Sequence, residues 1–387
     1  MKSFRIAIFW IHLAVGAAAG IVVLIMSVTG VALTYEKQML EWADRRAWTA
    51  PSPVDATHLP PETLLAAVAA ARPGTAPIGV TLRADAAAPA TVLLEGNRTL
   101  LLDPYTGAII GEPPAAWRSF FRTMTVWHRY IALEGTSRAT GKMITGAANL
   151  GFLFLVVSGL YLWFPRVWSW LQFKNVLWFR TGLTPKARHF NWHNVIGFWS
   201  CVPLAIIVAG VVPISFGWGN NLVYRLAGET PPAPAAAPQR PAQQTPPAYY
   251  SHGVDASWAA AIAERPAWRT ITTRLATSAN APIVVTVDEG YAGQPQKRRT
   301  LTFDGATAAL AKDEGFESLS AGRRARSWLR FAHTGEFYGL TGQTIAGLAS
   351  LAGACLVYTG LSLAFRRLAA WIKRRRAPEG FEQSRAA

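Results

Sequence analysis

The stretch Phe331–Phe365, FAHTGEFYGLTGQTIAGLASLAGACLVYTGLSLAF, decides the fold of this chain. Its last 22 residues, from Thr344 onward, carry no charge. At about 1.5 Å per residue, a helix of that length crosses a hydrocarbon core about 30 Å thick. His333 lies just before the uncharged run, and Arg366 and Arg367 follow it. We therefore predict a membrane span with a histidine near one of its ends.

The same arrangement occurs earlier in the chain. A shift of 201 positions lays TGKMITGAANLGFLFLVVSGLYLWF (140–164) over TGQTIAGLASLAGACLVYTGLSLAF (341–365) without a gap. Identical residues include the pairs Gly141/Gly342, Gly146/Gly347, Leu150/Leu351, Gly159/Gly360 and Leu160/Leu361. His128 precedes the first copy as His333 precedes the second, although the spacing differs. This pattern indicates an internal duplication.

Composition points to an integral membrane protein. The chain has 387 residues, of which 51% are apolar, and a further uncharged run of 28 residues, Ile6–Leu33, is far too long for the core of a signal peptide. Most of the net charge of +16 falls in basic segments beside span ends, within 1–5, 166–188 and 366–387. That distribution is the positive-inside bias, so we expect membrane lipid as a partner and no nucleic acid. Cys201 and Cys355 lie in apolar spans as packing residues, and no CxxC or CxxCH motif occurs.

The chain is predicted to be a mainly α membrane protein, a four-transmembrane-helix bundle with two α+β modules between spans 1 and 2 and between spans 3 and 4. Each module shows a short helix followed by strand-like segments and an Asp-containing turn. The second module is preceded by a Pro/Ala/Gln-rich linker, Glu229–Pro247. The predicted parts are span 1 (1–35), module 1 (36–126), an interfacial segment with span 2 (127–166), a loop (167–188), span 3 (189–218), the linker with module 2 (219–330), the outer histidine segment with span 4 (331–366) and a basic tail (367–387).

Four histidines form two pairs in this topology. If the basic loops and both termini are cytoplasmic, His12 and His193 lie at the cytoplasmic level of the bundle, and His128 and His333 lie at the opposite level. Two haem b groups with bis-imidazole ligation need this arrangement, because each iron takes one neutral nitrogen from each side of its ring. We therefore predict His12, His193, His128 and His333 as axial ligands of two haem irons.

Several alternatives remain open for these side chains. A single histidine at a span end is commonly interfacial or bonded to a backbone carbonyl. His189 lies one turn before His193 and could be the inner ligand instead, although only His193 shares the HxxxG spacing of His12 and Gly16. Arg122, Arg129 and Arg330 could neutralise haem propionates or anchor at the interface. A zinc or copper site is a weaker use of the histidines, because no acidic residue lies in any span.

The sequence resembles the PepSY-associated transmembrane family in three motifs. These are the His-xxx-Gly spacing at the start of the odd spans, SGLYLWFPR (158–166), and HTGEFYGLTG (333–342). The two modules resemble PepSY domains, although the turn Asp304-Gly305-Ala306 of the second is less complete than DPYTG (103–107) of the first. Members of this family include bacterial inner-membrane ferric-siderophore reductases and iron-uptake factors. The resemblance implies that the four histidines bind haem and that the modules are periplasmic.

The function predicted from these features is an oxidoreductase, a di-haem b ferric-siderophore reductase of the bacterial inner membrane. It would carry electrons from a cytoplasmic donor or quinol to a periplasmic ferric-siderophore and release iron as Fe(II). No GxGxxG, P-loop, GxSxG or HExxH motif occurs, and no acid–base catalytic residues are predicted. The alternatives are a non-enzymatic, membrane-anchored PepSY module that binds a periplasmic partner, and a haem-bearing electron-transfer subunit of another reductase.

Overall fold

The computed structural model describes residues 2–48, 57–164, 169–233, 249–278, 280–291 and 293–376. Most of the predicted linker and the end of the predicted basic tail lie outside these residues. The helices are α1 (Lys2–Leu33), α2 (Glu36–Arg46), α3 (Pro61–Ala71), α4 (Ala115–Tyr130), α5 (Arg138–Trp163), α6 (Trp170–Leu177), α7 (Pro185–Ser215), α8 (Gly217–Leu226), α9 (Val254–Glu264), α10 (Ala321–His333) and α11 (Gly339–Arg376). The strands are β1 (Pro77–Arg83), β2 (Ala90–Leu94), β3 (Arg98–Leu102), β4 (Ile109–Gly111), β5 (Thr270–Arg274), β6 (Ile283–Asp288), β7 (Arg298–Phe303) and β8 (Leu310–Gly315).

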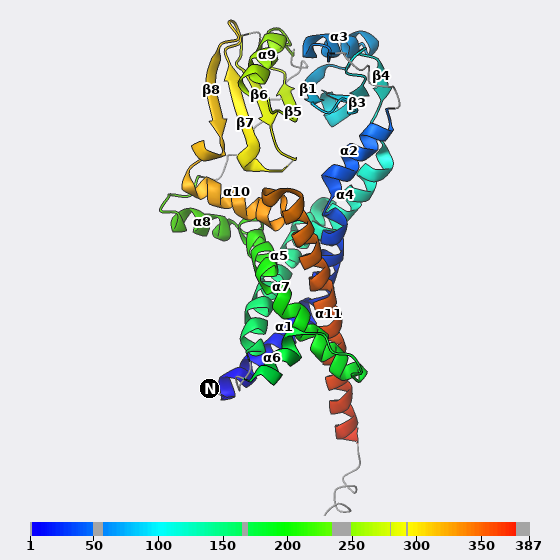
Figure 1. Ribbon diagram of the computed structural model, residues 1–387, viewed down its shortest axis with the longest axis vertical. Coiled ribbons are helices and arrows are strands. Elements are labelled where there is room, and N and C mark those ends of the chain that lie inside the picture. Colours follow the sequence, from blue (N-terminus) through cyan, green and yellow to red (C-terminus); the bar gives the residue numbers. More distant parts are fainter. Residues whose placement is uncertain are drawn as a thin grey trace, which may run out of the picture. The chain divides into compact units, whose positions relative to one another are not determined.

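The chain divides into two compact units. A span unit comprises 1–34, 123–219 and 344–387, and a sheet unit comprises 35–122 and 220–343. Four helices of the described chain, α1, α5, α7 and α11, are long and apolar enough to cross a membrane (Figure 1). The protein is therefore a membrane protein with a separate antiparallel sheet region.

Small residues let the long helices approach one another closely. The Cα of Gly20 on α1 faces Leu361 of α11, and that of Gly151 on α5 faces Val15 of α1. Asn149 of α5 donates a 3.0 Å hydrogen bond to the carbonyl oxygen of Val208 on α7. In an apolar environment such packing and buried polar contacts replace the hydrophobic effect as the force between helices.

All eight strands of the sheet unit form one antiparallel sheet in the order β4-β3-β2-β1-β5-β6-β7-β8. The two predicted modules are therefore joined: β1 of the first pairs with β5 of the second, with Thr81 opposite Thr272. The hydroxyls of these two threonines lie 3.0 Å apart in a hydrogen bond. Joining the modules in this way leaves neither β1 nor β5 with an unpaired edge.

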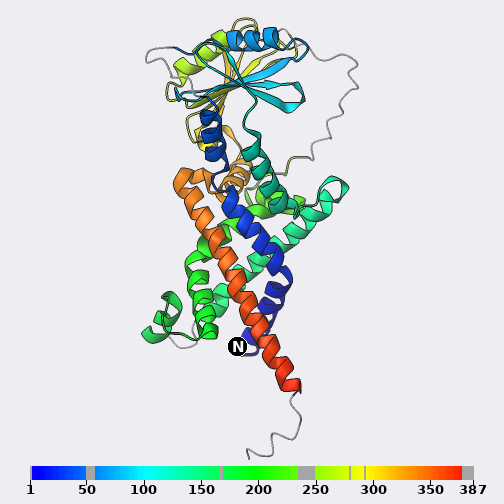
Figure 2. The same ribbon diagram turned by 90° about the vertical axis from the view of Figure 1, so that its right-hand side faces the viewer.

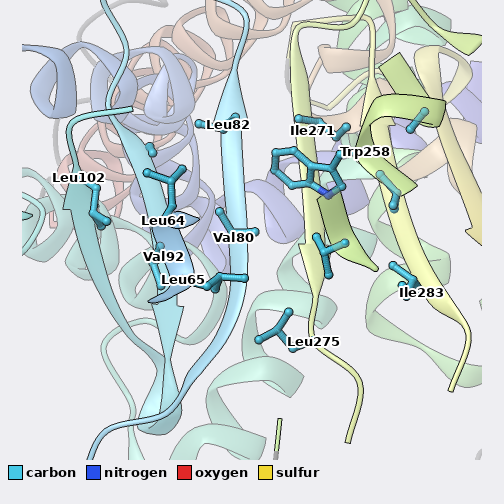
Figure 3. Packing of buried hydrophobic residues seen from close by; sticks show 14 of the residues in the cluster. Leu64, Leu65, Val80, Leu82, Val92, Leu102, Trp258, Ile271, Leu275 and Ile283 are labelled. Carbon is cyan, nitrogen blue, oxygen red and sulfur yellow. The ribbon is translucent and has the colours of Figure 1, made fainter. Parts of the chain in front are cut away.

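One hydrophobic core serves both halves of the sheet. Alternate residues of the strands, such as Val80 and Leu82 on β1, are buried beneath α3 and α9, which cover one face (Figures 2 and 3). The N-termini of the two helices cap each other. The amide of Glu62 donates to the Asp255 carboxylate over 2.8 Å, and the amide of Asp255 donates to the Glu62 carboxylate over 3.1 Å.

Candidate functional site

His12 and His193 each contact a hydroxyl-bearing side chain on a neighbouring span. His12 Nδ1 lies 2.8 Å from the hydroxyl oxygen of Ser158 on α5. His193 Nδ1 lies 2.9 Å from the hydroxyl oxygen of Thr359 on α11. Ser158 and Thr359 are 201 positions apart, the same shift that superposes the two span sequences. The pairing of His12 with His193 on one haem stays a prediction.

These contacts favour one tautomer of each imidazole. Ser158 donates its single hydroxyl hydrogen to the carbonyl oxygen of Phe154, at 2.6 Å, one turn back in its own helix. Thr359 donates likewise to Cys355, at 2.8 Å. Since each hydroxyl hydrogen is already donated to a backbone carbonyl, the hydroxyl oxygen accepts a hydrogen bond from the histidine Nδ1–H. The lone pair of each imidazole is therefore on Nε2, where it is available to a metal.

A glycine follows each of these hydroxyl residues and makes room for the ring. A Cβ atom on Gly159 would lie 3.4 Å from Cε1 of His12, and one on Gly360 would lie 3.3 Å from Cε1 of His193. The Gly360 distance is tighter than ordinary side-chain contacts, and the Gly159 distance lies at the edge of that range. A hydroxyl–glycine dipeptide thus holds the edge of the imidazole against the partner helix.

His128 has the same environment on a different pair of helices. Its Nδ1 lies 3.1 Å from the hydroxyl oxygen of Thr29 on α1, and that hydroxyl donates to the carbonyl oxygen of Ile25 over 2.6 Å. A Cβ atom on Gly30 would lie 3.4 Å from Cε1 of His128. The Thr29 hydroxyl therefore accepts a hydrogen bond from Nδ1–H of His128, as Ser158 and Thr359 do from their histidines.

The turn that follows α4 helps to position His128. Ile131 and Ala132, directly after the helix, have positive φ angles of 46° and 60°, which side-chain-bearing residues rarely adopt. The hydroxyl of Thr145 on α5 donates a 2.9 Å hydrogen bond to the carbonyl oxygen of Arg129. This bond ties the end of α4 to α5 and stabilises the reversal of the chain.

His333 is the last residue of α10 and belongs to the sheet unit, whereas His128 belongs to the span unit. The pairing of these two histidines stays a prediction. Gly335, two residues beyond the end of the helix, has a φ angle of +75°, which is typical of a glycine after a helix C-terminus.

His189 differs from His193 although the two share one face of α7. Its Nδ1 lies 2.7 Å from the hydroxyl oxygen of Ser362, and its ring meets that of Tyr358 edge-on, with centroids 5.5 Å apart. Within the described chain, Ser362 shows no bond to a backbone carbonyl that would fix the direction of this hydrogen bond. His189 is buried and no glycine faces its ring, so His193 has the environment shared with His12 and His128.

The arginines predicted beside the outer pair contact aromatic rings or lie exposed. The guanidinium of Arg129 lies 5.3 Å from the ring centroid of Tyr130, and that of Arg330 lies 5.5 Å from that of Phe331. Arg122 is exposed. Among the described residues no group of three or more His, Cys, Asp or Glu side chains gathers as a zinc site would require, whereas a haem iron takes only two imidazoles.

The sequence did not predict the hydroxyl–glycine dipeptides, although they were visible in it as Thr29-Gly30, Ser158-Gly159 and Thr359-Gly360. Their significance depends on which helix faces which histidine, and that information comes from the packing of the spans.

Four long apolar helices, each of which carries a histidine or faces one through a hydroxyl side chain, and a separate antiparallel sheet define an integral membrane protein. Residues 9–367 match the family described as the PepSY-associated TM region, and the chain belongs to this family. No curated protein matches the chain.

Proposed function

We propose that this protein is a di-haem b reductase of the bacterial inner membrane, with His12 and His193 as ligands of one haem and His128 and His333 as ligands of the other. The observation that carries the proposal is the shared environment of His12, His193 and His128. In each, Nδ1–H donates to a hydroxyl that is itself bonded to its own helix, which leaves Nε2 unprotonated. A neutral imidazole oriented through Nδ1 is the form that ligates haem iron.

The residues of the chain would hold and orient the cofactor. The hydroxyls orient the imidazoles, and the adjacent glycines admit the ring edges. When bound, each haem supplies a one-electron carrier within the membrane.

The direction of electron flow follows from the charge distribution. The basic segments beside the span ends support a topology in which both termini and the 167–188 loop are cytoplasmic. The sheet unit, which we interpret as a duplicated pair of PepSY-like modules, would then be periplasmic. Electrons would enter from a cytoplasmic donor or quinol at the His12 and His193 level and leave at the level of His128 and His333.

The proposed substrate is a ferric-siderophore. Hard oxygen ligands hold Fe(III) tightly and Fe(II) far less tightly, so transfer of one electron to the bound iron is sufficient to release it. Such a reaction needs a docking surface near the outer haem and no acid–base residue.

A visible spectrum of the detergent-purified protein, oxidised and dithionite-reduced, with haem quantified per chain, tests the proposal. We expect two b-type haems with low-spin bis-imidazole bands, and reoxidation of the reduced protein by ferric-siderophores. A colourless protein after expression with adequate haem would overturn the proposal and favour a non-enzymatic PepSY module. A red protein that ferric chelates do not reoxidise would favour an electron-transfer subunit of another reductase.

Substitution of the histidines tests the ligand assignment. His12→Ala or His193→Ala should remove the absorbance of one haem, and His128→Ala or His333→Ala that of the other. His252→Ala is the control, because this exposed histidine is not one of the predicted ligands. Two haems retained in all four variants would show that the assignment is wrong.

A further inference from the structure

Helix α8 carries an exposed apolar stripe directly after a membrane span. Only Phe216 separates Ser215, the last residue of α7, from the first residue of α8. Trp218, Leu222 and Leu226 follow at intervals of four, and they are 54%, 46% and 79% exposed. Residues four apart lie on one face of a helix. This face therefore begins within a few residues of the end of the span.

The opposite face of α8 is fixed to α10. Tyr224 of α8 is buried, and a Cβ atom on Gly322 of α10 would lie 2.5 Å from its ring, so this close approach requires glycine. Asn220 of α8 accepts a 2.6 Å hydrogen bond from the guanidinium of Arg326 on α10. Glu229 accepts from the Ser320 hydroxyl and the Gly322 amide at the start of α10. The two helices lie side by side as one platform (Figure 1).

The platform carries a dense positive charge. Exposed arginines extend along α10 at positions 323, 324, 326 and 330, and Arg225 lies on the exposed side of α8. None of these five arginines forms an ion pair with a residue that the structure describes. Exposed apolar side chains beside exposed arginines are the composition of a helix that lies in the surface of an anionic bilayer.

We propose that the α8–α10 platform is a lipid-binding surface. Trp218, Leu222 and Leu226 insert among the acyl chains at the end of α7, and the arginines of α10 bind the phosphates of anionic phospholipid headgroups. Because α10 ends at His333, the bound lipid also sets the position of this histidine at the bilayer surface. The proposal depends on the membrane character of the chain and not on the presence of haem.

Insertion of the stripe is tested with a fluorescent amino acid placed at position 226 of the full chain in phosphatidylcholine–phosphatidylglycerol nanodiscs. We expect quenching by doxyl-labelled lipid and little quenching by aqueous iodide. Leu310 on β8, 45% exposed, is the matched control position and should show the reverse. A second label at 222 guards against a local effect. If iodide quenches the labels at 222 and 226 as strongly as it quenches the label at 310, the proposal is overturned.

The headgroup contact is tested by titrating brominated phosphatidylglycerol into the chain labelled at 226 in neutral detergent. The double variant Arg324→Gln/Arg330→Gln should raise the half-quenching concentration about five-fold for each arginine removed. Arg274→Gln on β5 removes an equally exposed charge and should leave it unchanged. Binding of ferric citrate, a soluble anion, is measured on the same variants. If the double variant binds ferric citrate more weakly but shows an unchanged lipid titration, the arginines bind a soluble anion and the lipid proposal is overturned.

Discussion

At the scale of single residues, the hydroxyls of Ser158 and Thr359 orient the imidazoles of His12 and His193. Ser158→Ala and Thr359→Val remove the acceptor of each Nδ1–H and leave each ring free to change tautomer. Loss of such a partner typically weakens binding at a metal site about 10–100-fold. If the two imidazoles bind haem as proposed, both variants should lose haem to apomyoglobin faster than the unmodified protein, with the rate followed by absorbance.

Ser200→Ala is the matched control for these substitutions. Ser200 lies on α7 and, like Ser158, donates its hydroxyl hydrogen to the carbonyl oxygen one turn back, here that of Ile196 at 2.6 Å. No histidine contacts its hydroxyl in the described chain. Equal rates of haem loss in Ser200→Ala and Ser158→Ala would show that the effect comes from the helix and not from the histidine.

The sequence singled out the histidines as candidate ligands but did not indicate which residues orient them. His12 and His193 stand out because an ionisable side chain in an apolar span is costly and so usually functional. A serine or threonine in a span gives no such signal, since its hydroxyl can donate a hydrogen bond to a backbone carbonyl of the preceding turn. Which of the span hydroxyls meets an imidazole depends on helix pairing, and the sequence alone does not specify that.

At the scale of elements, an ion pair between the half-buried Arg118 and the buried Asp44 joins α4 to α2. Both oxygens of Asp44, which is 4% exposed, accept hydrogen bonds of 2.9 Å from the guanidinium of Arg118. Arg118→Met leaves a buried carboxylate without its partner, and this should cost about 3 kcal/mol of unfolding free energy. Urea unfolding of the purified chain measures the loss.

Arg98→Met provides the comparison, because Arg98 and Glu112 form an ion pair between side chains that are 52% and 61% exposed. Its loss should cost no more than about 1 kcal/mol. If the two substitutions were equally costly, burial of Asp44 would not be the source of the effect.

A second ion-pair network joins β7 and β8 and makes the sheet sensitive to acid. Hydrogen bonds from Arg299 hold the pKa of the Asp313 carboxyl below its usual range, and Arg265 adds to the effect. The unfolded chain therefore binds more protons at this site, so its stabilisation is present above the ordinary aspartate pKa and is lost as the pH falls through the folded pKa. Asp313→Asn should lower the melting temperature at pH 7 and much less at pH 3. Equal lowering at both pH values would contradict this.

Elements with a regular hydrophobic pattern were predictable, and irregular ones were not. The strands at 77–83 and 283–288 can be recognised from the sequence, because their apolar, buried residues alternate with less buried ones. β8 was missed because LAKDEG is mostly polar, and α8 because GWGNNLVYRL opens with glycines and asparagines that disfavour helices. Tertiary contacts stabilise both elements.

At the scale of the whole molecule, the two predicted modules form one folding unit in the sheet region. The sequence could not show this, because pairing of β1 with β5 brings together segments about 190 residues apart. The core beneath α3 and α9 contains residues of both halves, including Leu100 from β3 and Leu301 from β7. Shared burial of this kind makes unfolding cooperative.

Ile271→Ala tests this cooperativity. Ile271 is fully buried on β5, and its truncation should cost about 2–5 kcal/mol. Because both halves share one core, amide hydrogen exchange should accelerate by the same factor in β2 and β3 as in β6 and β7. Val284→Ala, a truncation at a 42% exposed position on β6, should leave both halves nearly unchanged. Acceleration confined to β5–β8 would mean that the modules unfold independently and that the β1–β5 pairing joins two separate domains.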